Sequence, residues 1–286
     1  MLSGVTCIRI ASLDDPRLEP FRELKKTNAT RWQGQFVVEG DKLVRRLLAS
    51  GLEIESVLAG EHLAAEFESL LPPHVPLLVV PAADVPRIVG FSFHRGVLAC
   101  GRRPSSGAAL DVLVGHAGCR NLVICPQVLD PQNLGSIVRS SAALGADGIV
   151  LGPGCCDVYC RRVLRVSMGA VFQLPVVISS DVVADLLRLR DEAGFELVAT
   201  VLDADAEPLA RASRPQRLGL VLGSEGHGLD ARIAALCERR VTIAMCRGTD
   251  SLNVAVATGV LLYHFLRGPQ GSPAGTSWPS EFRENT

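Results

Sequence analysis

Short runs that are apolar at every position constrain the fold of this chain most strongly. Leu122-Val-Ile-Cys125 and Ile149-Val-Leu151 carry apolar side chains at successive positions rather than at alternate ones. A strand buried on both faces has this pattern, and such strands belong to parallel sheets that helices cover on both sides. The sequence therefore predicts an α/β fold with a parallel sheet. Its predicted strands are residues 122–125, 148–151, 197–201 and 218–222, with a shorter strand at 241–244.

Helical periodicity fills the segments between these strands. After the first strand, apolar residues recur at helical spacing at Leu134, Ile137, Val138, Ala142 and Leu144. The predicted helices are residues 133–144, 158–168, 182–193, 229–237 and 252–266. Open α/β sheets bind their ligands at the carboxyl ends of the strands, so the loops that follow the strands are the candidate site.

A smaller alternating unit precedes this sheet. Its predicted strands are residues 35–39, 54–59, 77–80 and 96–100, and its predicted helices are residues 41–50, 62–71 and 84–89. This alternation predicts a compact three-layer module. The Gly-, Pro- and Ser-rich stretch at 101–107 has linker composition. We therefore divide the chain into an arm with a helix from about Asp14 (1–31), a small α/β domain (32–105), a larger domain (106–268) and a disordered tail (269–286).

The overall charge and cysteine content exclude several classes of protein. The net charge of −1 excludes a strongly polybasic chain, although Arg161, Arg162 and Arg165 form a local basic stripe, and Arg102 and Arg103 form another. Nine cysteines, an odd number, do not resemble a secreted disulfide framework. We find no signal peptide, and the longest apolar run, residues 254–262, is too short to span a bilayer. The sequence predicts a soluble, cytoplasmic protein.

The first candidate loop leads from the strand at 122–125 into the helix at 133–144. Asn133 and Arg139 would lie within two helical turns of each other, with Gly135 leaving the backbone open between them. An Asn and an Arg beside free amides can hold an anion or a sugar. The alternative interpretation is that Asn133 only caps the helix and Arg139 is a surface residue.

Two further loops follow the strands at 218–222 and 241–244. The first carries Gly223, Gly226 and Gly228, which allow close backbone approach to a flat ligand, and Glu225 adds a carboxylate. It could equally be a plain tight turn before a helix. The second loop ends in Ser251-Leu-Asn253, whose polar side chains either cap the last helix or face a ligand.

Two other groups of residues favour an ordinary structural role. His227 is interpreted as a surface turn residue. Cys155, Cys156 and Cys160 lie close together, but no second ligand pair stands at zinc spacing, so we interpret them as small buried hydrophobes or loop thiols and predict no metal site.

Together, the three loops resemble the three motifs of the SpoU (TrmH-like) family. The motifs are Asn133-x-Gly-x-x-x-Arg139, Gly223-x-Glu225-x-x-Gly228 and Ser251-Leu-Asn253 before an apolar helix. Matches such as Arg165-x-Ser-x-Gly-Ala170 lie between them, and the N-terminal unit, with Val38-Glu-Gly40 and His94-Arg-Gly96, resembles the family's L30e-like substrate-binding domain. The resemblance covers residues 35–267. Each motif is modest alone, but three in order at family spacing are specific.

The resemblance implies an S-adenosylmethionine-dependent RNA ribose 2′-O-methyltransferase with the SPOUT fold, a homodimer whose C-terminal part forms a trefoil knot. It implies that the cofactor is held in the knot, largely by backbone groups. Carried over by position, the cofactor residues are Leu222, Gly223, Ile243, Met245, Leu252 and Asn253. The implied catalytic residues are Asn133, Arg139, Glu225, Ser251 and Asn253. We expect Arg139, Arg162 and Arg165 to bind RNA, and the loop before Ser251, where small residues are common in the family, departs from it in Arg247 and Asp250.

Physical chemistry limits the role of Arg139. A guanidinium is effectively always protonated, so Arg139 is a poor general base; we expect it to grip the phosphate beside the target ribose and to stabilise the developing alkoxide. Asn133 would orient Arg139 or the ribose, Ser251 and Asn253 would position cofactor and substrate, and Glu225 is an alternative proton acceptor.

Several functions remain open at this point. The L30e-like unit favours ribosomal RNA, 23S rRNA in particular, over transfer RNA. A non-catalytic RNA-binding protein that retains the fold is a further alternative. A nucleotide-dependent oxidoreductase is disfavoured because no G-x-G-x-x-G with a downstream ribose-binding acid is present.

Overall fold

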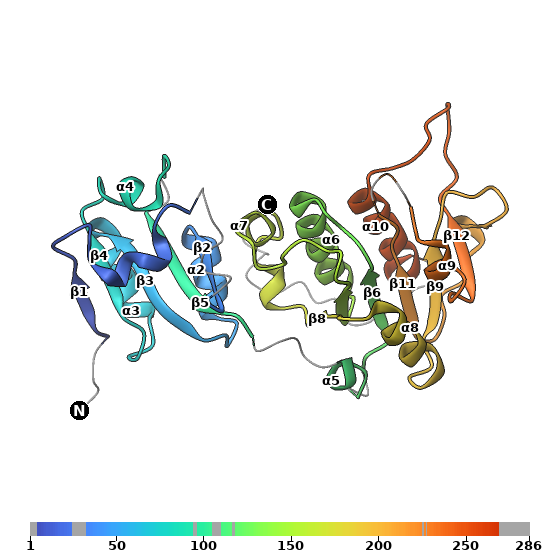
Figure 1. The fold of residues 1–286 in the computed structure, drawn as a ribbon, viewed down its shortest axis with the longest axis horizontal. Helices are drawn as coiled ribbons and strands as arrows, with labels where there is room; N and C mark the ends of the chain where they lie inside the picture. The colour runs from blue at the N-terminus through green and yellow to red at the C-terminus, as the bar shows by residue number, and fades with distance from the viewer. Residues whose placement is uncertain are drawn as a thin grey trace.

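Two β-sheets with their own helical layers make up the protein (Figure 1). The computed structural model describes residues 5–24, 33–93, 96–104, 110–115, 118–224, 226 and 228–268. The first sheet has five strands and the second has seven. Two sequence expectations fall partly outside these ranges, namely the His94-Arg-Gly96 motif and the tail from residue 269.

The N-terminal sheet has the order β1-β4-β3-β5-β2. Its strands are β1 (Cys7–Arg9), β2 (Gln35–Glu39), β3 (Ile54–Gly60), β4 (Leu77–Val80) and β5 (Val97–Arg102). The helices are η1 (Pro16–Phe21, 3-10), α2 (Asp41–Leu48), η2 (Glu61–Leu63, 3-10), α3 (Ala64–Leu70) and α4 (Val85–Val89). Strands β1, β4 and β3 run parallel, whereas β5 pairs antiparallel with both β3 and β2.

Successive side chains of these strands enter different cores, as the period of two requires. Val38 packs with the face covered by α2 and α3, while Val37 packs with the face covered by η1 and α4. The three-layer prediction is therefore confirmed. The sequence did not predict β1, and the helix expected near Asp14 is a short 3-10 helix that Asp15 caps through a bond from Arg17 N.

The C-terminal sheet has the order β10-β12-β9-β11-β6-β7-β8, and every neighbouring pair is parallel. Its strands are β6 (Asn121–Cys125), β7 (Gly148–Leu151), β8 (Val176–Ile178), β9 (Glu196–Thr200), β10 (Glu207–Pro208), β11 (Leu218–Val221) and β12 (Arg239–Thr242). The α-helices are α5 (Leu110–Gly115), α6 (Pro131–Leu144), α7 (Arg161–Val166), α8 (Val182–Asp191), α9 (Ala231–Ala234) and α10 (Val254–Leu262). Shorter turns are η3 (Ala170–Phe172), η4 (Leu209–Arg211) and the π-helical η5 (Tyr263–Arg267).

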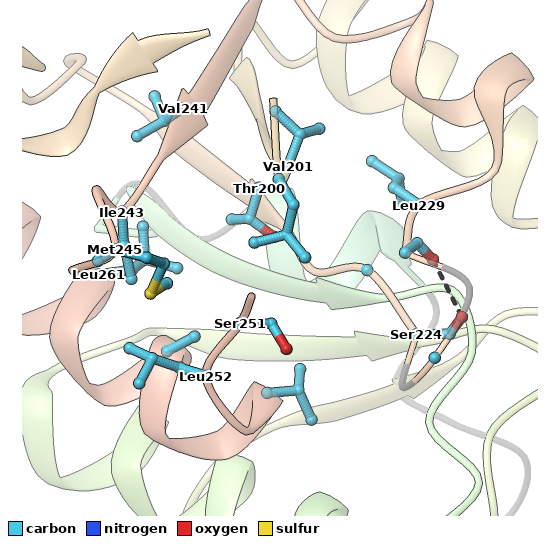
Figure 2. A pocket seen from close by; sticks show the side chains of 16 residues that line it. Thr200, Val201, Ser224, Leu229, Val241, Ile243, Met245, Ser251, Leu252 and Leu261 are labelled. Atoms are coloured by element: carbon cyan, nitrogen blue, oxygen red, sulfur yellow. Dashed lines mark hydrogen bonds between the residues drawn. The ribbon is translucent and has the colours of Figure 1, made fainter. Parts of the chain in front are cut away.

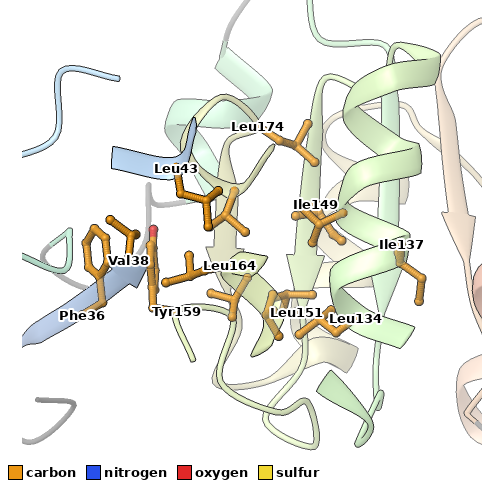
Figure 3. Packing of buried hydrophobic residues seen from close by; sticks show 14 of the residues in the cluster. Phe36, Val38, Leu43, Leu134, Ile137, Ile149, Leu151, Tyr159, Leu164 and Leu174 are labelled. Atoms are coloured by element: carbon orange, nitrogen blue, oxygen red, sulfur yellow. The ribbon is translucent and has the colours of Figure 1, made fainter. Parts of the chain in front are cut away.

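The predicted parallel sheet with helices on both faces is confirmed. One face packs against α6, α7 and α10, and the other packs against α5, α8 and α9. Figure 3 shows the first core, in which Leu134 of α6 lies beside Leu151 of β7, and Ile137 of α6 belongs to the same cluster. The sequence missed the edge strands β8 and β10, because segments of three and two residues carry too little pattern to identify. It also missed α5 and made α7 and α9 too long.

The two sheets meet where α7 packs against β2. The rings of Phe36 and Tyr159 lie with centroids 5.2 Å apart in a core cluster that runs through both sheets. Arg161 forms an ion pair with Glu39 at 2.5 Å, and Arg103 contacts Asp157 through two hydrogen bonds of 2.7 and 2.8 Å. These contacts join the N-terminal sheet to the C-terminal one.

This arrangement corrects part of the basic stripe expected from the sequence. Arg161 and Arg103 are committed to carboxylates inside the protein, and Arg102 pairs with Glu53 and Glu55 on the neighbouring strand. A guanidinium that already pairs with a carboxylate contributes little binding free energy to a contact with an RNA phosphate. Of the arginines expected to contact RNA, Arg162 and Arg165 form no ion pair with any described carboxylate.

Replacing Arg161 with alanine is expected to lower the free energy of unfolding by about 3 kcal/mol, because it leaves Glu39 buried without its cation. The Glu39 side chain is only 6% exposed. Urea denaturation would measure the loss. Arg188→Ala is the matched control, since Arg188 and its partner Asp111 are 40% and 67% exposed and such pairs contribute about 1 kcal/mol or less. Equal losses in the two variants would contradict a special role for the Arg161–Glu39 pair.

Candidate functional site

A cavity of about 430 Å³ opens at the carboxyl ends of β9, β11 and β12. Because neighbouring strands are parallel, the loops that follow them all emerge at this edge of the sheet. The lining is mostly apolar, with three hydroxyl groups from Thr200, Ser224 and Ser251. A space of this size with an apolar lining and a few polar groups is typical of a small-molecule site.

The loop after β11 forms one wall of the cavity. Ser224 N donates to Gly228 O at 2.8 Å, and Gly228 N donates back to Ser224 O at 3.1 Å, so the loop closes on itself. The Ser224 hydroxyl also donates to Gly228 O at 3.0 Å, which is the dashed line in Figure 2. This closure brings Gly228 against Gly223, where a Cβ on Gly223 would lie 2.9 Å from the Gly228 carbonyl carbon. Only glycine fits at position 223. Glu225 and His227 of the same loop lie outside the described residues.

The loop between β12 and α10 forms the opposite wall. Ile243, Met245, Ser251 and Leu252 line the cavity. Figure 2 shows Ile243 and Met245 together with Leu261 on one side, and Ser224 and Leu229 on the other. Five of the residues that the sequence analysis assigned to the cofactor or to catalysis therefore share one cavity: Gly223, Ile243, Met245, Ser251 and Leu252.

Leu222 and Asn253 are placed differently from these five. Leu222 is buried in the core and does not line the cavity. Asn253 lines an adjoining open groove between α6 and α10, together with Asn133. The groove and the cavity meet at the loop that carries Ser251, Leu252 and Asn253.

The side chain of Asn253 links the start of α10 to Asn133 of the first motif. Its Oδ1 accepts from Ala255 N at 2.9 Å and Val256 N at 3.4 Å, so it is the N-cap of α10. Its Nδ2 donates to Asn133 Oδ1 at 2.9 Å. The capping and ligand-facing interpretations of Asn253 therefore do not exclude each other, whereas Ser251 does not cap the helix.

Asn133 does not cap α6, in contrast to the alternative interpretation of the sequence. The N-cap is Asp130, whose Oδ1 accepts from Gln132 N at 2.9 Å, and Pro131 occupies the first helical position, where its missing N–H costs nothing. The helix therefore begins two residues earlier than predicted. This shift leaves the Asn133 side chain available for Asn253.

Three arginines that pair with no described carboxylate lie on α6 and α7. Arg139 is exposed on α6, and its side chain forms no ion pair or hydrogen bond with any described residue. Arg162 is exposed and donates through Nη2 to Gln132 Oε1, and Arg165 is half-buried on the same short helix. These are the three arginines that the sequence analysis assigned to RNA.

The sequence analysis missed the residues that β9 contributes to the cavity. Thr200, Val201 and Leu202 line it at the end of this strand, where Thr200 Oγ1 donates to Val221 O at 3.1 Å. The strand itself was predicted, but its position between β11 and β12 was not. Knowledge of the strand order would have been needed to find these residues.

The three neighbouring cysteines of the sequence analysis pack as small apolar side chains against the core. Cys155, Cys156 and Cys160 are half-buried and pack against the hydrophobic core. Burial raises the pKa of the Cys156 thiol to about 12, so it is neutral at physiological pH. Within the described part of the chain, no three His, Cys, Asp or Glu side chains are grouped to hold a metal ion. None of the described helices is long and apolar enough to cross a membrane.

Comparison with known proteins agrees with this geometry. A model of the SpoU rRNA Methylase family matches residues 120–263. A protein of Mycobacterium tuberculosis described as an uncharacterized tRNA/rRNA methyltransferase is 36% identical over 283 residues and covers 96% of each chain. The 23S rRNA (guanosine(2553)-2′-O)-methyltransferase RlmP of Bacillus subtilis is 27% identical over 255 residues, 89% of this chain and 95% of that one.

Among solved structures, an rRNA methyltransferase from Sinorhizobium meliloti bound to AdoMet superimposes with a TM-score of 0.78. It is 26% identical and covers 90% of this chain and 97% of its own. The matched residues 120–263 contain β6 to α10, and with them all three motif loops and the cavity. The chain belongs to the SpoU rRNA methylase family.

Proposed function

We propose that this protein transfers a methyl group from S-adenosylmethionine to a ribose 2′-hydroxyl of RNA in the cytoplasm. One observation carries the proposal: the cavity at the carboxyl ends of the strands adjoins the groove that holds Asn133 and Asn253, and the three motif loops together supply residues to the two spaces. A cofactor in the cavity would thus lie next to the pair of amide side chains that would face the substrate. The names of the relatives support the same reaction.

The residues of the cavity fit this cofactor. Ile243, Met245 and Leu252 offer apolar contacts to an adenine ring, and the closed loop at Gly223 brings backbone groups to the wall. Ser251 and Thr200 supply hydroxyls for polar groups of the cofactor. When bound, the cofactor supplies an electrophilic methyl group whose leaving group is a neutral thioether, so the reaction needs no general acid.

The protein's own contribution is to hold the ribose and to assist loss of its proton. Asn133 and Asn253 are fixed to each other, which positions the start of α6 relative to the cofactor loop. Arg139, two turns along α6, would bind the phosphate next to the target ribose and stabilise negative charge on the 2′-oxygen. Arg162 and Arg165 would extend this contact along the RNA, and Glu225 is the candidate proton acceptor.

We infer that ribosomal RNA, rather than transfer RNA, is the substrate. The five-stranded N-terminal unit, assigned to residues 32–105, would be an L30e-like RNA-binding domain, and residues 106–268 would form the knotted methyltransferase domain of the SPOUT fold. The arm at 1–31 and the tail at 269–286 complete the division. In support, the relative from Bacillus subtilis, named for 23S rRNA, covers 89% of this chain, including the N-terminal unit.

Tritiated methyl transfer tests the reaction and its substrate together. The substrates are unmodified large-subunit rRNA, small-subunit rRNA and transfer RNA, and label is mapped to the sugar by nuclease digestion. Label on a ribose of large-subunit rRNA is the expected result, and label confined to transfer RNA would overturn the substrate assignment. Cofactor binding without label in any RNA or in ribosomal particles would favour a non-catalytic RNA-binding protein. Absence of cofactor binding would refute the enzyme.

Asn253→Asp is expected to separate the two roles of Asn253. The aspartate still caps α10 through the same oxygen, so the melting temperature should change little. Its second oxygen replaces the Nδ2 donor and faces Asn133 Oδ1, so kcat/KM for methyl transfer should fall about tenfold or more. Asn253→Ala removes the cap as well and should also lower the free energy of unfolding by about 1 kcal/mol. Full activity in Asn253→Asp would show that the Asn133 contact is dispensable.

We also infer that two copies of the chain associate through α10. Val256, Val260 and Tyr263 are 54%, 41% and 60% exposed and line the groove beside α6. Three apolar side chains on one helical stripe form a patch that a second copy would cover. The resemblance to a homodimeric family supports this occupant. The substrate would then be held at the Asn133 and Asn253 end of the same groove, beside the contact between the two copies.

Val260→Asp is therefore expected to convert the dimer to a monomer, because it would bury a carboxylate in the contact. Size-exclusion chromatography with light scattering reads the mass directly. Val112→Asp is the control, since Val112 is 64% exposed on α5, a helix of the other sheet face. A wild-type monomer at micromolar concentration would refute the dimer.

A further inference from the structure

A second cavity, of about 580 Å³, lies at the amino ends of strands in the C-terminal sheet, whereas the cofactor cavity lies at the carboxyl ends. Arg120 immediately precedes β6, and Arg214 lies four residues before β11, so both sit at the amino ends of parallel strands. Arg267 reaches the same place from the end of η5, beside the carboxyl end of α6. Three arginines from distant parts of the chain thus converge on one space.

Carboxylates in the described part of the chain do not neutralise the charge of these arginines. Arg103, Arg161 and Arg239 each pair with a carboxylate at 2.5–2.9 Å. No described carboxylate forms an ion pair with the three arginines of the second cavity.

Asp147 is the single acidic residue among the described residues that line the cavity, and its carboxylate accepts hydrogen bonds from groups other than the three guanidinium groups. Asp147 Oδ2 accepts from the backbone nitrogens of Arg120 and Asn121, both at 2.8 Å, and from Asn121 Nδ2 at 3.2 Å. Three arginines and one aspartate leave the lining with a formal charge of +2 (3 − 1).

The guanidinium groups of Arg214 and Arg267 are each fixed by one hydrogen bond to the protein, and their other N–H groups form no hydrogen bond with any described residue. Arg214 Nη2 donates to Asn121 Oδ1 at 3.1 Å, and its buried Nε has no hydrogen-bond partner. Arg267 Nε donates to Leu144 O at 3.0 Å. A guanidinium has five N–H donors, so each retains several after these contacts. These remaining donors are the ones that an anion in the cavity would engage.

We propose that this cavity binds a phosphate group, and that the RNA backbone supplies it. Arginine forks match phosphate oxygens in charge and geometry, whereas none of the described residues that line the cavity is an aromatic side chain on which a base could stack. The 14-residue α6 separates Asn133 from this site, a helix length of about 20 Å, so the phosphate belongs to a segment of RNA other than the target nucleotide. The RNA source rests on the proposed function, whereas the phosphate site itself does not.

The test is the salt dependence of RNA binding by the double variant Arg120→Gln, Arg267→Gln. Arg214 is left intact because its Nε is buried and its Nη2 holds Asn121 Oδ1 at the start of β6. With an unmodified large-subunit rRNA transcript, the variant should bind about tenfold more weakly at 0.1 M salt. The slope of log K against log salt should decrease by about 1 to 2, since each phosphate contact contributes about 0.7 to 0.9. Cofactor affinity should not change.

The control is Arg188→Gln, Arg232→Gln, which removes the same charge from two arginines that are 40% and 88% exposed and already paired. An equal loss in this control would show a general charge effect and overturn the proposal. Equal RNA binding by wild type and the Arg120/Arg267 variant would overturn the assignment of this cavity to RNA. A titration with small phosphate ligands then decides whether the cavity binds phosphate at all.

The second experiment measures the increase in melting temperature that inorganic phosphate and pyrophosphate produce. Stabilisation of wild type that the Arg120/Arg267 variant lacks, with RNA binding unchanged, would assign the site to a small phosphate ligand instead of RNA. If wild type binds no RNA at all, the proposed function fails, and the phosphate titration still decides this site. Equal responses of wild type and variant to phosphate would then refute it.

Discussion

Replacing Arg139 with alanine is expected to lower kcat/KM for methyl transfer by about 10²–10³-fold, while the Kd for S-adenosylmethionine stays within about twofold. The expected loss corresponds to removing one preorganised donor from a charge that develops in the transition state. The side chain is exposed on α6 and forms no ion pair or hydrogen bond with any described residue, so its removal should leave folding intact. Single-turnover methylation with saturating cofactor measures the effect.

Arg139→Lys distinguishes between two ways in which Arg139 acts. If it mainly grips phosphate, lysine keeps the charge and should retain appreciable turnover, with weaker RNA binding because the bidentate fork is lost. Loss of turnover with unchanged RNA affinity would count against that role and favour a direct contact to the reacting oxygen. Arg232→Ala, at an 88% exposed position on α9, is the matched control and should be fully active.

Gly223→Ala is expected to weaken cofactor binding by about 5- to 150-fold. The new Cβ would lie 2.9 Å from the Gly228 carbonyl carbon and 3.0 Å from Leu229 N, and both are backbone atoms that cannot move aside like a flexible side chain. The loop closed by Ser224 and Gly228 must therefore open, at a cost of about 1–3 kcal/mol, which corresponds to about 5- to 150-fold in affinity. Isothermal titration calorimetry with S-adenosylmethionine measures it directly.

Gly115→Ala is the control for this substitution. A Cβ at Gly115, at the end of α5, meets no atom within 4 Å, so the same chemical change should leave cofactor binding and stability unaltered. If Gly223→Ala bound the cofactor as tightly as wild type, the loop would not form a wall of the cofactor site. RNA affinity without cofactor should be unchanged in both variants.

Local patterns determined much of the architecture. The continuous apolar runs predicted the parallel strands, because a strand covered on both faces needs apolar side chains at every position. Turn chemistry identified the loops after β11 and β12, since glycines and a capping Asn mark such turns within a few residues. The signal was weakest in β8 and β10, whose pairing depends on neighbours elsewhere in the chain rather than on their own composition.

The sequence by itself therefore determined most of the strands, most helices and the three loops, because each depends on residues close together in the chain. The order of the strands was decided only by tertiary structure, and that order places Thr200 of β9 in the cavity between the loops. The same holds for side-chain partners. Asp130 caps α6 and leaves Asn133 to bond Asn253, and Arg161 turns to Glu39 across the junction of the two sheets. Such pairings join residues 120 and 122 positions apart, and no local periodicity records them.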